Sequence, residues 1–126
     1  MPDPATDSRG LPPGYPFKPD WEISPRQVKQ LRDAGEDFLL LDCRTPGEWH
    51  TARIDGATLL PMQQTAERVS ELDAHRQRKI IVYCHHGMRS LQVTSFLRRQ
   101  GFADVRSMAG GIDLWSVDID SNVPRY

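Results

Sequence analysis

The chain has 126 residues, a length that fits one folded domain and hardly more. With 38% hydrophobic and 26% charged residues, a formal net charge of −1 and no apolar run of about 18 residues, it has the composition of a globular protein and gives no indication of a nucleic-acid partner or a membrane span. The two cysteines, Cys43 and Cys84, are too few for a disulfide scaffold, and the first residues lack the apolar stretch of a secretory signal, so we expect a cytoplasmic protein.

The first 19 residues contain six of the ten prolines. Proline fixes φ and removes an N–H donor, so regular helices and strands are not expected there. We therefore divide the chain into a proline-rich N-terminal arm at 1–19, with its first ten residues disordered, and a folded domain at 20–126. Tyr15 and Phe17 are too apolar for a solvated tail and predict that the later part of the arm packs on the domain.

Signals for strands and helices alternate along the domain. Ser24 and Gln27 match a capping box with Pro25 at the first helical position, and Gly35 is placed to end that helix. The most strand-like segment is 79–83, which is rich in β-branched and aromatic residues. Further strands are expected at 38–41, 57–60 and from Val105, and further helices over 66–72, over 89–100 and after Gly110-Gly111. This alternation predicts an α/β fold in which a central parallel sheet of about five strands carries helices on both faces.

Cys84 follows the strand at 79–83 and precedes the helix at 89–100. Ligands of parallel sheets bind beyond the carboxyl ends of the strands, which is where this cysteine lies. Three features favour its thiolate, the nucleophilic form: loop N–H groups that converge on the sulfur, the positive end of the helix, and the charge of Arg89. Gly87 allows the backbone conformation that such a loop needs. A buried structural cysteine is the alternative, but the polar residues that follow favour a functional site.

The loop Cys84-His85-His86-Gly87-Met88-Arg89-Ser90 resembles the active-site loop of single-domain rhodaneses. Four further segments resemble motifs of that family in the correct order, so the resemblance extends over about residues 22–116: Leu41-Asp42-Cys43-Arg44 with Glu48-Trp49, Ile54-Asp55-Gly56-Ala57, Gly101-Phe102-Ala103-Asp104-Val105 and Gly110-Gly111-Ile112-Asp113-Leu114-Trp115. The sequence departs from the family at Ala52-Arg53, where Gly-His is usual, and at Asp55, where Pro is usual. We interpret these as changes in an exposed turn that leave the sulfur chemistry intact. Any structural role that the family's histidine has at this turn is not expected to carry over to Arg53.

The resemblance implies a rhodanese-like fold and a two-step sulfur transfer that uses no cofactor. The Cys84 thiolate would attack the outer sulfur of a small donor such as thiosulfate or a persulfide, releasing sulfite in the first case. The Cys84 persulfide would then pass its sulfur to cyanide, a small thiol or a protein acceptor. The expected substrate-binding residues, whose N–H groups and Arg89 charge would stabilise the anionic sulfur, are His85, His86, Gly87, Met88, Arg89 and Ser90.

Residues outside the loop are expected to support it. Asp42 and Arg44, at the end of the strand over 38–41, are expected to hold the loops by ion pairing, with direct contact to the donor as the alternative. Glu48 is expected to be an ion-pair or capping partner, and Trp115 to lie in the core rather than at the pocket rim. Cys43 is expected to be a buried spectator on a neighbouring strand, with a second redox thiol as the alternative.

A metal site at Cys84, His85 and His86 is not expected. The side chains of adjacent histidines in a tight loop should point apart, and three successive residues give poor tetrahedral geometry. The two histidines are instead expected to shape the pocket and to add positive potential when they are protonated.

Two other functions remain open. A Cys–Arg loop also suits phosphate, so a small-anion phosphatase or arsenate reductase is one alternative. Tyrosine phosphatases place the arginine six residues after the cysteine, whereas Arg89 follows Cys84 by five, and the smaller loop favours a single sulfur atom. The other alternative is a non-catalytic rhodanese-like binding module, although such modules usually lack the cysteine that is present here.

Overall fold

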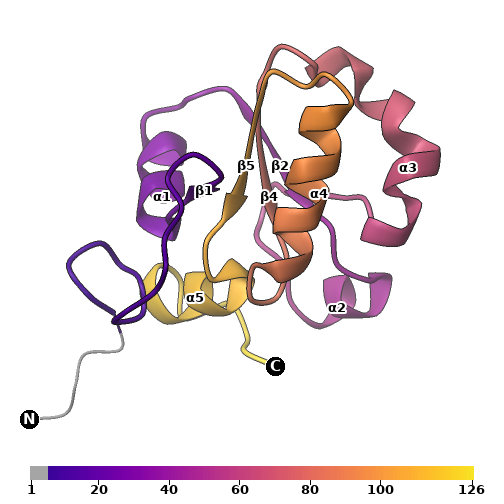
Figure 1. Ribbon diagram of the computed structural model, residues 1–126. Coiled ribbons are helices and arrows are strands. Elements are labelled where there is room, and N and C mark those ends of the chain that lie inside the picture. Colours follow the sequence, from indigo (N-terminus) through magenta and orange to yellow (C-terminus); the bar gives the residue numbers. More distant parts are fainter. Residues whose placement is uncertain (1–5) are drawn as a thin grey trace, which may run out of the picture.

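The computed structural model describes residues 6–126 (Figure 1). The strands are β1 (Glu22–Ile23), β2 (Phe38–Asp42), β3 (Thr58–Leu59), β4 (Lys79–Tyr83) and β5 (Asp104–Met108), and the α-helices are α1 (Pro25–Asp33), α2 (Pro46–Thr51), α3 (Thr65–Arg68), α4 (Met88–Arg99) and α5 (Gly111–Asp118). Two 3₁₀ segments, Met62–Gln64 and Val69–His75, flank α3. The strands form one parallel sheet in the order β1-β5-β4-β2-β3. Within residues 6–126, none of the helices has the length and apolar character needed to cross a membrane.

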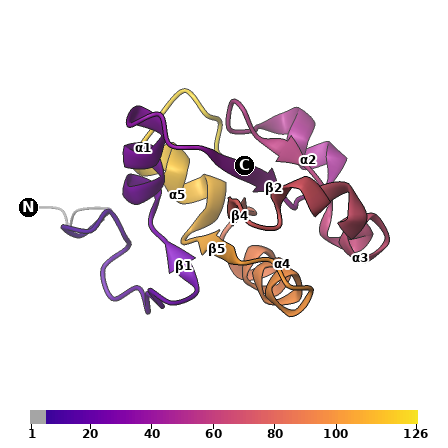
Figure 2. The same ribbon diagram turned by 90° about the horizontal axis from the view of Figure 1, so that it is seen from above.

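Helices cover both faces of the sheet, which confirms the predicted α/β architecture. Seen from above, α1 and α5 lie on one side of the strands, and α3 and α4 lie on the other (Figure 2). The side chains of β4 alternate between the two layers: Ile81 and Tyr83 join the core beneath α1 and α5, whereas Ile80 and Val82 join the core beneath α4. Successive residues of a strand point to opposite faces, so burial on both faces explains the continuous apolar sequence of β4.

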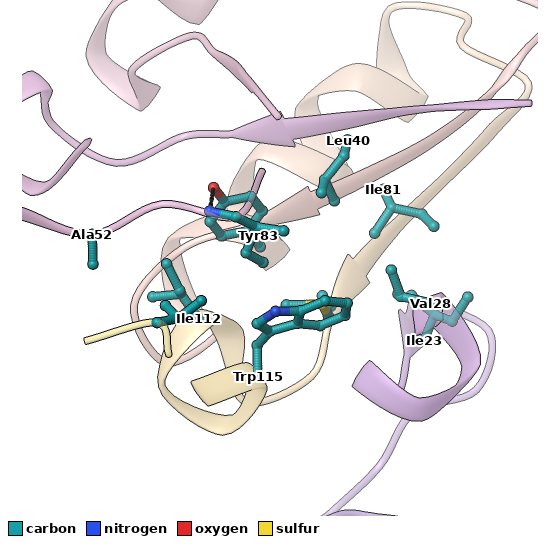
Figure 3. Close-up of a cluster of buried hydrophobic side chains, with 11 residues drawn as sticks. Ile23, Val28, Leu40, Ala52, Ile81, Tyr83, Ile112 and Trp115 are labelled. Carbon is teal, nitrogen blue, oxygen red and sulfur yellow. Dashed lines mark hydrogen bonds between the residues drawn. The ribbon is translucent and has the colours of Figure 1, made fainter. Parts of the chain in front are cut away.

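The core beneath α1 and α5 is built around Trp115. Its indole extends from α5 toward the sheet and lies between Val28 of α1 and Tyr83 of β4 (Figure 3). Trp115 is buried, which confirms its expected place in the core. The Tyr83 hydroxyl in the same cluster accepts the Ile54 N–H at 3.2 Å, so this buried phenol is hydrogen-bonded.

Most of the predicted elements are present, and the differences lie in short segments. β4 spans the residues predicted for it, and Ser24 and Gln27 form the predicted capping box of α1. The segment expected as one helix over 66–72 is instead the four-residue α3 followed by a 3₁₀ segment, with Ala66 exposed. The sequence does not predict β1 and α2, because elements of two and six residues are too short to show a periodic pattern.

The N-terminal arm packs on the domain, as the sequence predicts. Leu11 is fully buried in a cluster with Ala109 and Leu114, which flank the start of α5. Tyr15 and Phe17 pack against this cluster. The arm therefore contributes to a small core of its own beside α5.

The disorder expected over the first ten residues does not extend to residues 6–10. The Asp7 carboxylate accepts hydrogen bonds from the backbone N–H groups of Arg9 and Leu11 at 2.8 and 3.2 Å, and the Arg26 guanidinium of α1 donates to the Ser8 carbonyl at 3.1 Å. These contacts fix a turn in this part of the arm. Residues 1–5, to which the same expectation applies, lie outside the described residues.

Candidate active site

The loop at 84–87 joins the carboxyl end of β4 to the first turn of α4, at the lower edge of the sheet in Figure 1. Gly87 ends the loop with a φ of 114°, a left-handed conformation that favours glycine. Gly87 is also the N-cap of α4 and has no side chain to cap the helix, so the first N–H groups of α4 are available to an anion at the Cys84 sulfur. A Cβ on Gly87 would lie 3.4 Å from the Gly110 nitrogen, so the loop closely contacts the start of α5.

The first turn of α5 holds the other side of the loop. The Ile112 N–H donates to the Cys84 carbonyl at 2.8 Å, and the Asp113 N–H donates to the His85 carbonyl at 3.1 Å. Gly111 permits this approach, because a Cβ there would lie 2.4 Å from the Cys84 carbonyl oxygen. With both carbonyl groups bonded to α5, N–H groups further along the loop are directed at the Cys84 sulfur.

The Cys84 sulfur has several hydrogen-bond partners. The Gly87 N–H donates to it at 3.0 Å and the Ser90 N–H at 3.4 Å, and the Ser90 hydroxyl lies 3.4 Å away. The Ser90 hydroxyl is oriented by a 2.7 Å contact with the Ser107 hydroxyl of β5. Hydrogen bonding from Cys43, followed by that from Ser90 and Gly87, outweighs burial and lowers the pKa of the Cys84 thiol to about 5. The sulfur is therefore a thiolate at neutral pH.

Cys43 lies beside Cys84. Asp42 and Tyr83 are register partners in β2 and β4, and the Cys43 N–H donates to the Tyr83 carbonyl at 3.1 Å, so the two cysteines are the next neighbours along these strands. Both belong to the core beneath α4, and each is 1% exposed. Hydrogen bonding to Cys84, together with burial, raises the pKa of the Cys43 thiol far above its ordinary value, so Cys43 stays protonated.

Arg89 has a different partner from the one that the sequence suggests. Its two terminal nitrogens donate to the two carboxylate oxygens of Glu48 at 2.7 and 2.9 Å, a bidentate pair between α4 and α2. Glu48 also completes a capping box with Thr45 at the start of α2, so it has both of the contacts expected for it. The Glu48 carboxylate offsets the charge of the Arg89 guanidinium, so Arg89 gives less positive potential at the Cys84 sulfur than the sequence suggests. A role for Arg89 in substrate binding stays a prediction.

Asp42 and Arg44 form a buried ion pair beside the loop. Both side chains are fully buried, and Nη2 of Arg44 lies 2.7 Å from Oδ2 of Asp42. Arg44 also donates to the Ala52 carbonyl at 2.6 Å and to the Tyr126 hydroxyl at 2.7 Å, and Asp42 accepts the Arg44 backbone N–H at 2.9 Å. These contacts agree with the pairing expected for the two residues and connect the end of β2 to α2.

His85 and His86 do not point apart as expected. Their ring centroids are 3.9 Å apart, and the Tyr126 ring stacks on His85 at 4.1 Å with an interplanar angle of 9°. Burial, followed by the charge of His86, lowers the pKa of His85, so the positive potential expected from the protonated imidazole arises only at a lower pH than for an ordinary histidine. Met88, the next expected binding residue, has 76% of its surface exposed. Within residues 6–126, no group of three His, Cys, Asp or Glu side chains is placed to hold a metal ion.

Two tyrosines that the sequence does not predict at the site reach it from segments far from Cys84: Tyr126, and Tyr15 of the arm, for which only packing on the domain is expected. The Tyr126 hydroxyl donates to Glu48 at 2.6 Å and accepts from Arg44, so it links two residues that support the loop. The Tyr15 hydroxyl of the arm would lie 3.9 Å from a Cβ on Gly87. Neither tyrosine stands in a motif, and only the fold brings them to the loop.

The match to known proteins agrees with this geometry. A family model described as "Rhodanese-like domain" matches residues 24–118. The chain is 37% identical over 95 residues to the protein named sulfurtransferase of Allochromatium vinosum, covering 75% of this chain and 87% of that protein. It is 35% identical over 103 residues to thiosulfate sulfurtransferase GlpE of Pseudoalteromonas translucida, covering 82% of this chain and 95% of that protein. A solved structure of a rhodanese-like domain protein from Staphylococcus aureus is 22% identical and has a TM-score of 0.72, covering 84% of this chain and 98% of that one, which supports the fold.

Longer relatives also match. The probable adenylyltransferase/sulfurtransferase MoeZ of Mycobacterium tuberculosis is 31% identical over 106 residues, which cover 82% of this chain. The matched part is only 26% of MoeZ, so this chain spans about a quarter of the length of that relative.

Proposed function

Because the chain belongs to the rhodanese-like family, we propose that it is a sulfurtransferase in which Cys84 carries the transferred sulfur as a persulfide. The observation that carries this proposal is the Cys84 sulfur at the N-terminus of α4, with the Gly87 and Ser90 N–H groups donating to it and a thiol pKa of about 5. Relatives named sulfurtransferase and thiosulfate sulfurtransferase support the class of reaction. Thiosulfate as the donor and cyanide or a thiol as the acceptor are parts of the proposal.

Sulfur uptake follows from the ionised state of Cys84. The thiolate attacks the outer sulfur of thiosulfate, a new S–S bond forms, and sulfite leaves with the electron pair of the S–S bond that breaks. No general base is needed, because the thiol has already lost its proton at neutral pH. The terminal sulfur of the persulfide is anionic and forms next to the N–H groups at the start of α4. Cys84 is 1% exposed, so the donor reaches it only after local movement of the surrounding side chains or of the loop.

In sulfur delivery the outer sulfur is again the atom attacked, and Cys84 changes from nucleophile to leaving group. A nucleophilic acceptor attacks the outer sulfur, and Cys84 leaves as a thiolate. A low thiol pKa makes Cys84 a good leaving group as well as an ionised nucleophile. Cyanide, a small thiol and the cysteine of a protein acceptor all have the required nucleophilic character.

The remaining loop residues are proposed to bind the donor. The His85 side chain offers a buried Nε2 that has no hydrogen-bond partner among the described residues, and in the tautomer with its proton on Nε2 it would donate to a sulfonate oxygen of the donor. His86, Met88 and Arg89 line the more exposed side of the loop, and Ser90 holds the sulfur itself. The supporting roles are proposed for Asp42, Arg44 and Glu48, whose contacts fix the neighbouring segments.

The phosphatase alternative has less support. A phosphate ester would need the Arg89 guanidinium, whose terminal nitrogens both donate to Glu48, whereas the transferred sulfur atom depends first on the Gly87 and Ser90 N–H groups. The step of five residues from Cys84 to Arg89 also gives a smaller loop than a phosphate-binding loop with six. A non-catalytic module would not need the lowered thiol pKa of Cys84.

Intact-protein mass spectrometry tests the proposal. After incubation with thiosulfate, the native protein should gain one sulfur atom, which peptide mapping places on Cys84 and which cyanide removes as thiocyanate. Cys84→Ser should gain no sulfur and should form no thiocyanate, because its hydroxyl cannot form a persulfide. Thiocyanate production by Cys84→Ser, or a folded native protein that never takes up sulfur, would show that the proposal is wrong.

A further inference from the structure

Cys43 is a nucleophilic group that the proposed transfer does not use. It follows β2 as Cys84 follows β4, one residue beyond the register pair Asp42 and Tyr83. Both cysteines belong to the same core beneath α4, so their side chains lie on the same face of the sheet. Neighbouring strands are about 4.8 Å apart, and disulfides join Cα atoms about 4.4–6.8 Å apart. The two thiols are therefore within reach of a disulfide.

We propose that Cys43 is the resolving thiol of Cys84: after a peroxide has oxidised the Cys84 sulfur, Cys43 condenses with it to give a reversible Cys43–Cys84 disulfide. The inference rests on the proposed function only in treating Cys84 as the reactive cysteine. A disulfide leaves Cys84 unable to accept sulfur, so sulfur transfer stops until a thiol reductant restores both cysteines.

The oxidation has two balanced steps. The Cys84 thiolate attacks one oxygen of hydrogen peroxide, the O–O bond breaks, and the products are Cys84 sulfenic acid and hydroxide. The Cys43 sulfur then attacks the Cys84 sulfur, the S–O bond breaks, and the hydroxyl group leaves with the Cys43 proton as water. The two sulfur atoms together lose two electrons, which the peroxide gains.

The charge at Cys84 sets the order of these steps. While Cys84 is a thiolate, its interaction with Cys43 holds the pKa of Cys43 high, so Cys43 stays protonated and does not compete for the sulfur donor. The sulfenic acid of Cys84 is uncharged, so its formation removes the part of this shift that the thiolate causes, although not the part due to burial, and makes Cys43 a better nucleophile. Each cysteine is 1% exposed, which favours a thiol that is already in place over a bulky thiol from solution.

Peroxide treatment followed by peptide mapping tests the inference. The native protein is oxidised at low concentration without any sulfur donor, alkylated, and analysed by intact mass and by mapping without reduction. We expect a loss of two hydrogen atoms per chain and a linked Cys43–Cys84 peptide, which is unambiguous because the sequence has only these two cysteines. Sulfurtransferase activity should fall with the linkage and return after addition of dithiothreitol.

Two variants provide the control. Cys43→Ser and Cys43→Ala cannot form the disulfide, so Cys84 should proceed to sulfinic and sulfonic acid, and dithiothreitol should not restore activity. Each variant is compared with its own untreated activity, and circular dichroism verifies that it is folded. If neither variant folds, the presence or absence of the linked Cys43–Cys84 peptide in the native protein still decides whether Cys43 is the resolving thiol.

Two results would overturn the inference. One is a native protein in which Cys84 becomes sulfinic acid while Cys43 remains an alkylatable thiol, and the other is recovery of Cys43→Ser that equals native recovery. The linkage is measured without thiosulfate, so failure to load sulfur in the separate thiosulfate assay would refute the proposed function and leave this inference standing.

Discussion

Replacing Asp42 by asparagine removes the negative partner of a fully buried guanidinium. The Asp42 carboxylate accepts from the Arg44 backbone N–H at 2.9 Å, from Nε at 2.9 Å and from Nη2 at 2.7 Å. Asparagine has the same shape but carries no charge, and its amide group brings N–H donors toward a side chain that has only donors. Asp42→Asn therefore leaves a buried charge without its counter-ion.

The expected loss of stability follows from the burial of this pair. Removing one partner of a buried ion pair costs about 3–5 kcal/mol. Arg44 keeps the Ala52 carbonyl and the Tyr126 hydroxyl as partners, so we expect the free energy of unfolding to fall by about 3 kcal/mol. With a urea m-value of about 2 kcal/mol per M, the unfolding midpoint should fall by about 1.5 M.

Urea unfolding, followed by tryptophan fluorescence, to which the buried Trp115 contributes, measures this difference. The matched control is Glu71→Gln, which breaks the exposed ion pair with Arg68 at 2.8 Å. An exposed pair is worth at most about 1 kcal/mol, so the midpoint of the control should fall by no more than about 0.5 M. If Asp42→Asn shifts the midpoint as little as Glu71→Gln does, the argument from burial is refuted.

Four further predictions follow from the site and the arm. Alkylation of Cys84 by iodoacetamide should fall as the pH drops through about 5, because protonation then removes the thiolate; a midpoint near 9, the ordinary value, would contradict the hydrogen-bond argument. Leu11→Ala should lower the free energy of unfolding by about 2–5 kcal/mol in urea titrations, since Leu11 is fully buried, and an unchanged value would mean that the arm does not pack in solution. Gly87→Ala should slow sulfur loading in the mass assay, because Gly87 has a φ of 114° and contacts Gly110. The control Gly14→Ala, which also has a positive φ of 78° but lies in open space, should load sulfur like the native protein. Equal loading rates in the two variants would contradict the role given to the loop geometry. The native protein should hydrolyse a small aryl phosphate far more slowly than it converts thiosulfate, and the opposite order in paired rate assays would favour the phosphatase.

The central strands could be predicted because burial on both faces marks consecutive residues. β2 and β4 each contain an unbroken run of four apolar residues, preceded in β4 by Lys79 and followed in β2 by Asp42. β1 has only two residues, and its place at the sheet edge depends on pairing with β5, which lies far along the chain. The helix expected over 66–72 shows that a short pattern can also overpredict a helix. Three apolar residues at helical spacing lie here in a four-residue helix followed by a 3₁₀ segment.

The site was predictable only where it depends on neighbours in sequence. The position of Cys84 after β4, and the need for Gly87, follow from the local order of strand, loop and helix. The partner of Arg89 does not, because Glu48 lies 41 residues away and reaches Arg89 only through the placement of α2 beside α4. The contact between Ser90 and Ser107 has the same origin, as it depends on β5 lying next to β4.

The positions of Tyr15 and Tyr126 have a consequence for how this protein is studied. Both lie outside residues 24–118, the part that the family model matches, yet both reach the cysteine loop. A chain trimmed to the matched residues would keep β2, β4 and Cys84 but lose the two aromatic side chains that border the loop. Rates and substrate preferences measured on such a fragment would describe a more open site, so comparisons between relatives are meaningful only when the flanking segments of each protein are retained.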